Sequence, residues 1–209
     1  MEDVLDLYAQ PYDARFPVVC FDESPYQLIG EVRQPLAPQP GHPQRYDSHY
    51  QRNGTCNLFM FFEPRSGWRH VEVTARRTKQ DFARCMQQLV DGYDPEAEVI
   101  RVVVDNLNIH TPAALYDCLP PREAHRLLQH LEFHYTPKHG SWLNMVEIEL
   151  SVLAGQCLKR RLPDKATVQQ EIAAWERQRN EAKATVQWRF TTEKARTKLP
   201  HLYPSQPVW

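Results

Sequence analysis

Two apolar segments that each end in an aspartate constrain the fold of this chain more than any other feature of its sequence. The first is PVVCFDES at residues 17–24, and the second is EVIRVVVDN at residues 98–106. Unbroken apolar runs of this length are typical of strands that are buried on both faces of a sheet. If the two strands are parallel neighbours, Asp22 and Asp105 emerge side by side at one edge of that sheet.

The rest of the pattern predicts a mixed α/β domain. Residues 55–64 and 68–77 flank the turn sequence PRSG and are expected to form an antiparallel hairpin. Residues 31–54 contain four prolines and are expected to form a long loop. Helices are predicted at 78–93, 111–130 (interrupted by Pro120 and Pro121), 141–158 and 164–182, with a further strand at 131–137.

Composition narrows the class of protein. The 42% hydrophobic and 24% charged residues are ordinary for a globular domain. No apolar run approaches the roughly 20 residues that span a bilayer, and the acidic, mixed N-terminus is not a targeting peptide. The expected compartment is therefore the cytoplasm, with no membrane partner. The five cysteines are far apart and form no C-x-x-C, which argues against a zinc ribbon or a disulfide framework.

Paired strand-end aspartates suggest a metal site. Two carboxylates held close together repel each other unless a proton or a cation lies between them, and their hard oxygens suit Mg²⁺ or Mn²⁺. A third acid would complete a two-metal site that acts on the attacking and leaving oxygens of a phosphodiester. We expect this acid in the helix that contains WLNMVEIELS. Its apolar stripe is flanked equally by Glu147 and Glu149, so periodicity does not choose between them.

The segments VVCFDES, VVVDNLNIH and YTPKHGSWLNMVEIELSVL resemble the three acidic motifs of the DDE transposases. They are most similar to those of the mariner-like transposases of bacterial insertion sequences, and the likeness extends over nearly the whole chain. The resemblance implies an RNase H-like mixed sheet, with a hairpin plus parallel strands and helices on both faces. It also implies that Asp22, Asp105 and Glu147 are the catalytic acids and hold two Mg²⁺ or Mn²⁺ ions. Glu147 is preferred because it follows the W-L-N-x-x element at the family's position.

The function that the resemblance implies is transposition of DNA. Metal-dependent cleavage frees a 3′-hydroxyl, which is then transferred to target DNA without a covalent enzyme intermediate. The implied partners are transposon-end and target DNA, a second copy in a homodimer, and a helix-turn-helix recognition unit. This unit is expected on a separate subunit or a frame-shifted upstream product, because none precedes the first motif here. The expected organisation is a catalytic domain at 1–198 and a proline-rich tail at 199–209, acting at the bacterial nucleoid.

Two other functions stay open at this stage. One is an RNase H-like nuclease or resolvase, which would cleave a structured DNA substrate without joining strands. The other is a truncated, non-catalytic fragment that binds DNA or a partner copy. Strand joining separates the first from a transposase, and metal binding separates the second.

Several further side chains are candidates for supporting the acids or contacting DNA. Asn106 and His110 follow the second aspartate and either position it or form the turn after the strand. Trp142 is expected to be buried, as tryptophan usually is, with base stacking as the second interpretation. Residues 155–198 hold eleven Lys and Arg against five Asp and Glu, which suits a phosphate backbone or a solvated helix face. The full set of candidates is Asn106, His110, Lys138, His139, Trp142, Asn144, Arg160 and Arg161.

Overall fold

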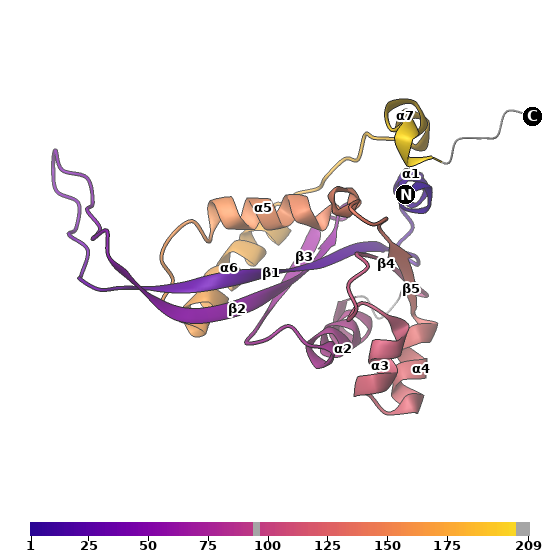
Figure 1. Cartoon of the computed structure of the whole chain (residues 1–209), viewed down its shortest axis with the longest axis horizontal. Helices are drawn as coiled ribbons and strands as arrows, with labels where there is room; N and C mark the ends of the chain where they lie inside the picture. Colours follow the sequence, from indigo (N-terminus) through magenta and orange to yellow (C-terminus); the bar gives the residue numbers. More distant parts are fainter. Residues whose placement is uncertain (94–96, 204–209) are drawn as a thin grey trace, which may run out of the picture.

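A five-stranded mixed sheet forms the centre of the computed structural model, which describes residues 1–93 and 97–203 (Figure 1). The strand order is β3-β2-β1-β4-β5. Strands β1 and β2, and likewise β2 and β3, pair antiparallel, whereas β1, β4 and β5 run parallel. The predicted hairpin plus parallel strands are thereby confirmed. The bounds are β1 Val18–Glu31, β2 Tyr50–Glu63, β3 Trp68–Thr74, β4 Ile100–Val104 and β5 Leu131–Tyr135.

Helices cover both faces of the sheet, as predicted (Figure 1). Because successive side chains of a strand point to opposite faces, Cys20 packs with Val146 of α5 while Phe21 packs with Phe82 of α2. Helix α6 lies beside α5 and packs against β3, and α1 lies against α7. The bounds are α1 Glu2–Ala9, α2 Lys79–Gln88, α3 Pro112–Cys118, α4 Pro121–Gln129, α5 Val146–Gln156, α6 Lys165–Glu181 and α7 Thr192–Lys198.

Local sequence explains where the two best-defined helices begin. Thr78 and Asp81 form a capping box at the start of α2, and a π-helical turn over Leu89–Tyr93 continues it. At the start of α6, the side chain of Asp164 accepts a hydrogen bond from the backbone N–H of Thr167. The predicted helices at 78–93 and 164–182 are therefore confirmed within a few residues.

The predicted loop at 31–54 is wrong at both ends. Strand β1 continues to Glu31 and β2 begins at Tyr50, so that only residues 32–49 connect them. The two strands extend beyond the helices as a two-stranded arm (Figure 1). Residues 50–55 of β2 are exposed, so neither of their faces needs apolar side chains. Without such alternation, the strand gave no sequence signal.

Three further elements differ from the sequence-based expectation. Helix α1 was not predicted, although its Leu5 and Leu7 are buried in the core. Helix α7 was also missed. The predicted helix at 141–158 begins instead as a 3-10 turn over Ser141–Leu143, and the α-helix starts only at Val146. The predicted tail at 199–209 contains a 3-10 turn at Pro200–Leu202, and residues 204–209 lie outside the described residues.

Among residues 1–93 and 97–203, no helix is both long and apolar enough to cross a membrane. All five cysteines are free thiols, and only Cys118 is not fully buried. The cysteines therefore behave as small core side chains.

Candidate active site

The two strand-end aspartates lie at the same edge of the sheet. In the parallel pair of β1 and β4, Val18 is opposite Arg101 and Cys20 is opposite Val103. Continuing that register by two residues sets Asp22 opposite Asp105, which directly follows the last residue of β4. The structure thus brings together the two acids on which the sequence argument depends.

Asp22 is in an environment that disfavours its negative charge. Burial is the largest cause, and the neighbouring carboxylates of Glu23 and Asp105 add to it, so that the pKa of Asp22 rises to about 7. One hydrogen bond opposes this effect, because the backbone N–H of Glu23 donates to Oδ1 of Asp22 at 2.7 Å. A carboxylate in such surroundings is stabilised by a proton or by a cation.

Asp105 is held in its ionised form by a buried histidine. Its Oδ1 lies 2.6 Å from Nδ1 of His110 and accepts a hydrogen bond from the backbone N–H of Leu107 at 3.1 Å. The hydrogen bond with His110 is the main cause that lowers the pKa of Asp105. Burial by itself lowers the pKa of His110, but the contacts with Asp105 and Glu23 outweigh it and raise the pKa to about 9. The imidazole is therefore a cation between two carboxylates.

Glu23 completes this group, and sequence reasoning missed it. Its Oε2 forms an ion pair with Nε2 of His110 at 2.9 Å, although the direction is poor for a hydrogen bond. Its Oε1 lies 3.3 Å from Nη1 of Arg77, which is half-exposed. A signal was present, because an acid that directly follows Asp22 in a strand must point to the opposite face. There it is buried and requires a cationic partner.

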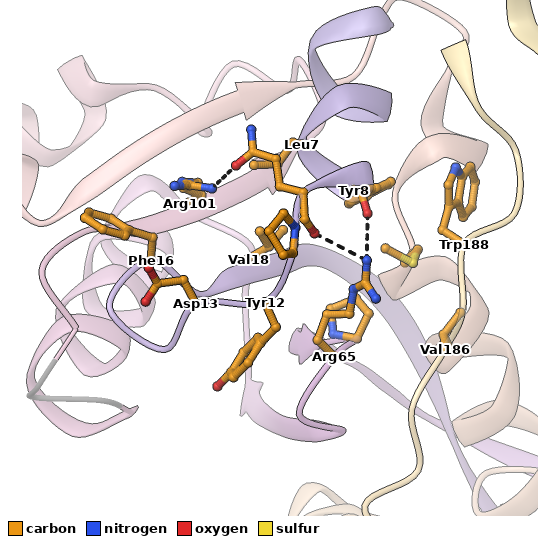
Figure 2. A pocket seen from close by; sticks show the side chains of 14 residues that line it. Leu7, Tyr8, Tyr12, Asp13, Phe16, Val18, Arg65, Arg101, Val186 and Trp188 are labelled. Carbon is orange, nitrogen blue, oxygen red and sulfur yellow. Dashed lines mark hydrogen bonds between the residues drawn. The ribbon is translucent and has the colours of Figure 1, made fainter. Parts of the chain in front are cut away.

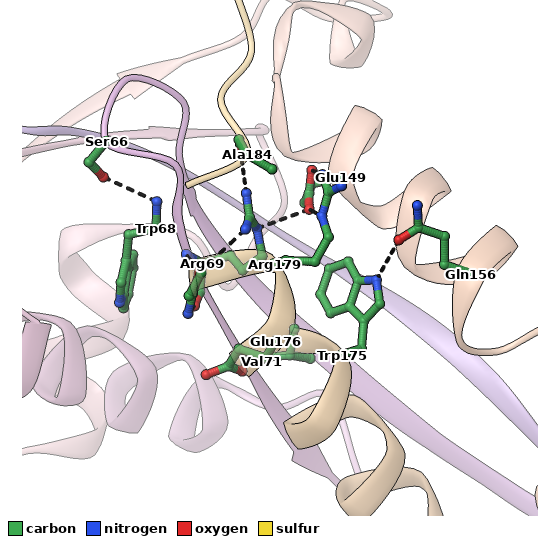
Figure 3. Close-up of polar contacts among 11 residues, drawn as sticks. Ser66, Trp68, Arg69, Val71, Glu149, Gln156, Trp175, Glu176, Arg179 and Ala184 are labelled. Carbon is green, nitrogen blue, oxygen red and sulfur yellow. Dashed lines mark hydrogen bonds and ion pairs between the residues drawn. The ribbon is translucent and has the colours of Figure 1, made fainter. Parts of the chain in front are cut away.

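Glu149 takes part in a buried ionic network. Its carboxylate lies 2.9 Å from Nε of Arg69, and neither side chain is exposed (Figure 3). Arg179 donates from Nε and Nη2 to the two oxygens of the same carboxylate, each at 2.9 Å. Glu149 thereby links α5 to β3 and α6. By contrast, Glu147 is partly exposed, and its side chain makes no hydrogen bond or ion pair with the described residues.

Helix geometry places Glu147 on the other side of α5. Residues two apart in an α-helix differ by about 200° around the axis. Since Glu149 points toward β3 and α6, Glu147 leaves the helix in roughly the opposite direction. In the strand order β3-β2-β1-β4-β5, that direction leads away from β3.

Asn144 connects the start of α5 to the first aspartate strand. Its Nδ2 donates to the backbone carbonyl of Phe21 at 2.9 Å, directly before Asp22 in the chain. The backbone carbonyl of Asn144 accepts a hydrogen bond from the backbone N–H of Glu147 at 3.1 Å. The side chain is fully buried. Asn144 therefore fixes the turn that presents Glu147 relative to Asp22.

We expect Asn144→Ala to lower the free energy of unfolding by about 1–3 kcal/mol, because it leaves the buried carbonyl of Phe21 without its donor. Urea denaturation followed by circular dichroism measures the change. Asn108→Ala is the matched control, since Asn108 is exposed and should change stability by less than about 0.5 kcal/mol. Equal stability of the two variants would contradict this role of Asn144.

The donor set at this edge fits a hard divalent cation, although the three acids do not converge. Among the residues that the structure describes, no three His, Cys, Asp or Glu side chains are close enough to hold one metal ion together. The structure brings Asp22 and Asp105 together and leaves Glu147 on the first turn of α5. Carboxylate oxygens are the ligands that Mg²⁺ and Mn²⁺ prefer. Burial, and after it the carboxylates of Glu23 and Asp105, raises the pKa of Asp22, and a bound cation would stabilise its charged form.

The loop after β5 lies at the same edge as Asp105. The side chain of Asn106 donates a hydrogen bond to the carbonyl of Thr136, and the Thr136 N–H donates to the Val104 carbonyl. The loop exposes Lys138 and His139, and His139 has a φ of 62°, in the left-handed region. Asn106 therefore supports the loop rather than forming only a turn.

The remaining candidates are engaged elsewhere. The expectation that Trp142 is buried is wrong: it is 43% exposed and stacks on Trp188, because residues 141–143 form a 3-10 turn at the surface. Arg160 pairs with Glu171. Arg161 pairs with Glu31 at 2.5 Å and donates to the carbonyls of Asp47 and His49.

A pocket at the opposite end of the strands is separate from this site (Figure 2). It lies between α1, the start of β1 and the segment that contains Trp188. Arg65 closes one side by donating to the carbonyls of Tyr8 and Gln10, and Arg101 donates to the side chain of Gln10. Because Val18 and Arg101 stand at the beginning of their strands, the pocket faces away from Asp22 and Asp105.

Comparison with known proteins agrees with this architecture. A family model described as DDE superfamily endonuclease matches residues 17–169. The fold is similar to the Mos1 mariner paired end complex with Mn (TM-score 0.57, 19% identity, 87% of this chain and 54% of that one). It is also similar to the Mos1 transposase paired-end complex with left transposon end (TM-score 0.54, 18% identity, 88% and 60%).

These matches confirm the predicted RNase H-like fold. The chain spans between 54% and 60% of the length of these two solved chains. A comparison with curated protein sequences gives no match.

Proposed function

This chain belongs to the DDE superfamily endonuclease family, and from that premise we propose that it cleaves and transfers DNA strands in transposition. Asp22, Asp105 and Glu147 are the catalytic and metal-binding acids in this proposal. The observation that carries it is the parallel register of β1 and β4, which sets two aspartates side by side beside the first turn of α5. An insertion-sequence element of the mariner-like kind is the proposed source.

The choice of Glu147 over Glu149 is supported by what each side chain contacts. Glu149 neutralises two arginines in the interior and has no exposed surface. Moving it to a metal site would leave the charge of Arg69 buried without a partner. Glu147 makes no hydrogen bond or ion pair among the described residues, and helix geometry directs it away from β3 and α6.

We expect the edge of the sheet that carries Asp22 and Asp105 to bind a divalent metal and DNA. A Mos1 structure contains Mn, and other Mos1 structures are paired-end or pre-cleavage complexes. Two Mg²⁺ or Mn²⁺ ions would supply activation of water and stabilisation of the attacking and leaving oxygens. The chain's own residues supply rigid placement: β1 and β4 carry the aspartates, and α5 carries Glu147.

The proposed reaction has two balanced steps. In the first, water attacks a phosphorus atom at the transposon end and the bond to the 3′ oxygen breaks, which leaves a 3′-hydroxyl. In the second, that hydroxyl attacks a phosphodiester of target DNA and displaces its 3′ oxygen. One phosphodiester is formed for each one broken in the second step, so strand transfer requires no nucleotide cofactor. The proposed active form is a homodimer that uses a helix-turn-helix unit to recognise the ends.

We expect the chain to nick supercoiled plasmid in Mg²⁺ or Mn²⁺ and to leave it intact in excess EDTA. Agarose electrophoresis measures the fraction of nicked circles. Restoring Mn²⁺ to the EDTA-treated protein should restore nicking, which controls for loss of folded protein. Nicking that persists at full rate in EDTA would contradict a metal-dependent mechanism.

A nuclease without strand transfer is the second candidate, because the acids and the fold are shared by both activities. A labelled duplex that ends in a free 3′-hydroxyl separates them. A transposase joins this duplex to plasmid, and a labelled band appears at plasmid size. Nicked plasmid without joined label would favour the nuclease.

A further inference from the structure

Four charged side chains form a continuous chain that ends at Asp105. Arg77 contacts Glu23 at 3.3 Å, Glu23 contacts His110 at 2.9 Å, and His110 contacts Asp105 at 2.6 Å. The two central members are almost completely buried, since the side chain of His110 is 0% exposed and that of Glu23 is 2% exposed. This row of four side chains extends from Arg77 in the loop after β3, across β1, to Asp105 at the end of β4.

The imidazole of His110 is fixed from several directions. Its ring packs edge-on against Phe21 at 5.5 Å and lies 5.1 Å from the ring of Phe82. The hydroxyl of Tyr135 donates to the backbone carbonyl of His110 at 2.9 Å. With both ring nitrogens in contact with carboxylates, the imidazole has no freedom to rotate without losing an ion pair.

The contacts of Asp105 are confined to one of its two oxygens. Oδ1 receives both the imidazole of His110 and the backbone N–H of Leu107. Within the described part of the chain, Oδ2 takes part in no hydrogen bond or ion pair. The carboxylate is therefore oriented through Oδ1, which leaves Oδ2 available to a ligand.

We propose that His110 and Glu23 are positioning residues for the metal-binding edge. Glu23 orients the imidazole, and the imidazole holds Oδ1 of Asp105 so that Oδ2 is presented to a divalent cation. This inference rests on the proposed function insofar as Asp105 is a metal ligand. Partners that hydrogen-bond a ligating carboxylate typically contribute about 10–100-fold to metal affinity or activity.

A purely structural role predicts a different result. A buried ion pair contributes little net stability compared with apolar side chains of similar volume, because its charges lose their hydration. Replacing such a group can change stability, but it leaves the metal affinity of the folded protein unchanged. Metal affinity is therefore the readout that separates the two roles.

Mn²⁺ binding by the 209-residue chain, followed by electron paramagnetic resonance of the free ion, tests the proposal. We expect His110→Ala to weaken Mn²⁺ binding by about 10–100-fold. Glu23→Gln should weaken it in the same direction but less, because the amide oxygen still faces the imidazole although it no longer carries the full charge of the ion pair. His70→Ala is the matched control: His70 forms a similar pair with Glu176 at 3.1 Å on β3, away from the aspartates, and should bind Mn²⁺ like wild type.

The nicking assay gives a second readout on the same variants. His110→Ala should require about 10–100-fold more Mn²⁺ for half-maximal nicking and should recover activity as Mn²⁺ is raised. Added imidazole should partly restore the Mn²⁺ affinity of His110→Ala by occupying the vacated space. A merely structural histidine would show neither the shift in metal requirement nor the rescue.

The possible outcomes are distinguishable. Wild-type Mn²⁺ affinity in folded His110→Ala would overturn the positioning role. If that variant does not fold, unchanged affinity in Glu23→Gln would overturn it instead. A wild-type chain that binds Mn²⁺ with this dependence on His110 but cleaves no DNA would reject the proposed function and leave the positioning role intact. A wild-type chain that binds no Mn²⁺ would reject both.

Discussion

An Asp105→Asn variant is expected to nick DNA at least about a thousand-fold more slowly than the wild-type chain. The substitution retains the shape of the side chain but removes the charge that holds a cation in the proposed mechanism. A bound metal contributes several kcal/mol of transition-state stabilisation, and each 1.36 kcal/mol corresponds to a factor of ten in rate. Single-turnover nicking of plasmid at fixed Mg²⁺ measures the loss.

The matched control for this prediction is Asp117→Asn. Asp117 is an exposed acid on α3 that pairs with Lys79, so its replacement should leave nicking within about twofold of wild type, as for most surface substitutions. Thermal unfolding of both variants checks that each is folded. A nicking rate for Asp105→Asn within tenfold of wild type would exclude Asp105 as a catalytic acid.

The sheet and its two aspartates were predictable from sequence because the information is local. A strand buried on both faces requires an unbroken apolar run, and both runs are visible in the chain. Parallel strands deliver the residues at their carboxyl ends to a common edge, so the juxtaposition of Asp22 and Asp105 follows from the direction of β1 and β4. The one long-range condition was that the two strands are parallel neighbours, and the structure meets it.

The different surroundings of Glu147 and Glu149 were not predictable from periodicity, because the information is distant in sequence. Both acids flank the apolar stripe of α5 equally. What separates them is Arg69 on β3 and Arg179 on α6, which meet Glu149 only in the folded chain. The family resemblance preferred Glu147, and the buried network supplies an independent physical reason for that preference.

Two other features were hidden for similar reasons. The alternation of the strand indicates that Glu23 points away from Asp22, but its partner His110, more than eighty residues later, is identified only by the fold. The extended strands of the arm lack alternation because solvent reaches their exposed residues, as at Gln51. Neither an exposed strand nor a buried ion pair produces a hydrophobic periodicity, which is the main signal for predicting structure from sequence.

Glu149→Ala is expected to lower the free energy of unfolding by about 3–5 kcal/mol, because it leaves buried Arg69 without its anion. A typical domain has only about 5–15 kcal/mol in total, so this variant should be close to unfolding at physiological temperature. Urea denaturation followed by circular dichroism measures the loss. In the Glu149→Ala variant, α5 also loses its connection to β3 and α6.

Glu147→Ala should show the opposite pattern and is therefore the decisive comparison. Its side chain is partly exposed and makes no hydrogen bond or ion pair with the described residues, so stability should change by less than about 0.5 kcal/mol. Metal-dependent nicking should nevertheless be lost, because the third acid is absent. If Glu147→Ala nicks DNA normally while a folded Glu149→Gln does not, the third acid is Glu149. The arginine network would then have to open before metal binds.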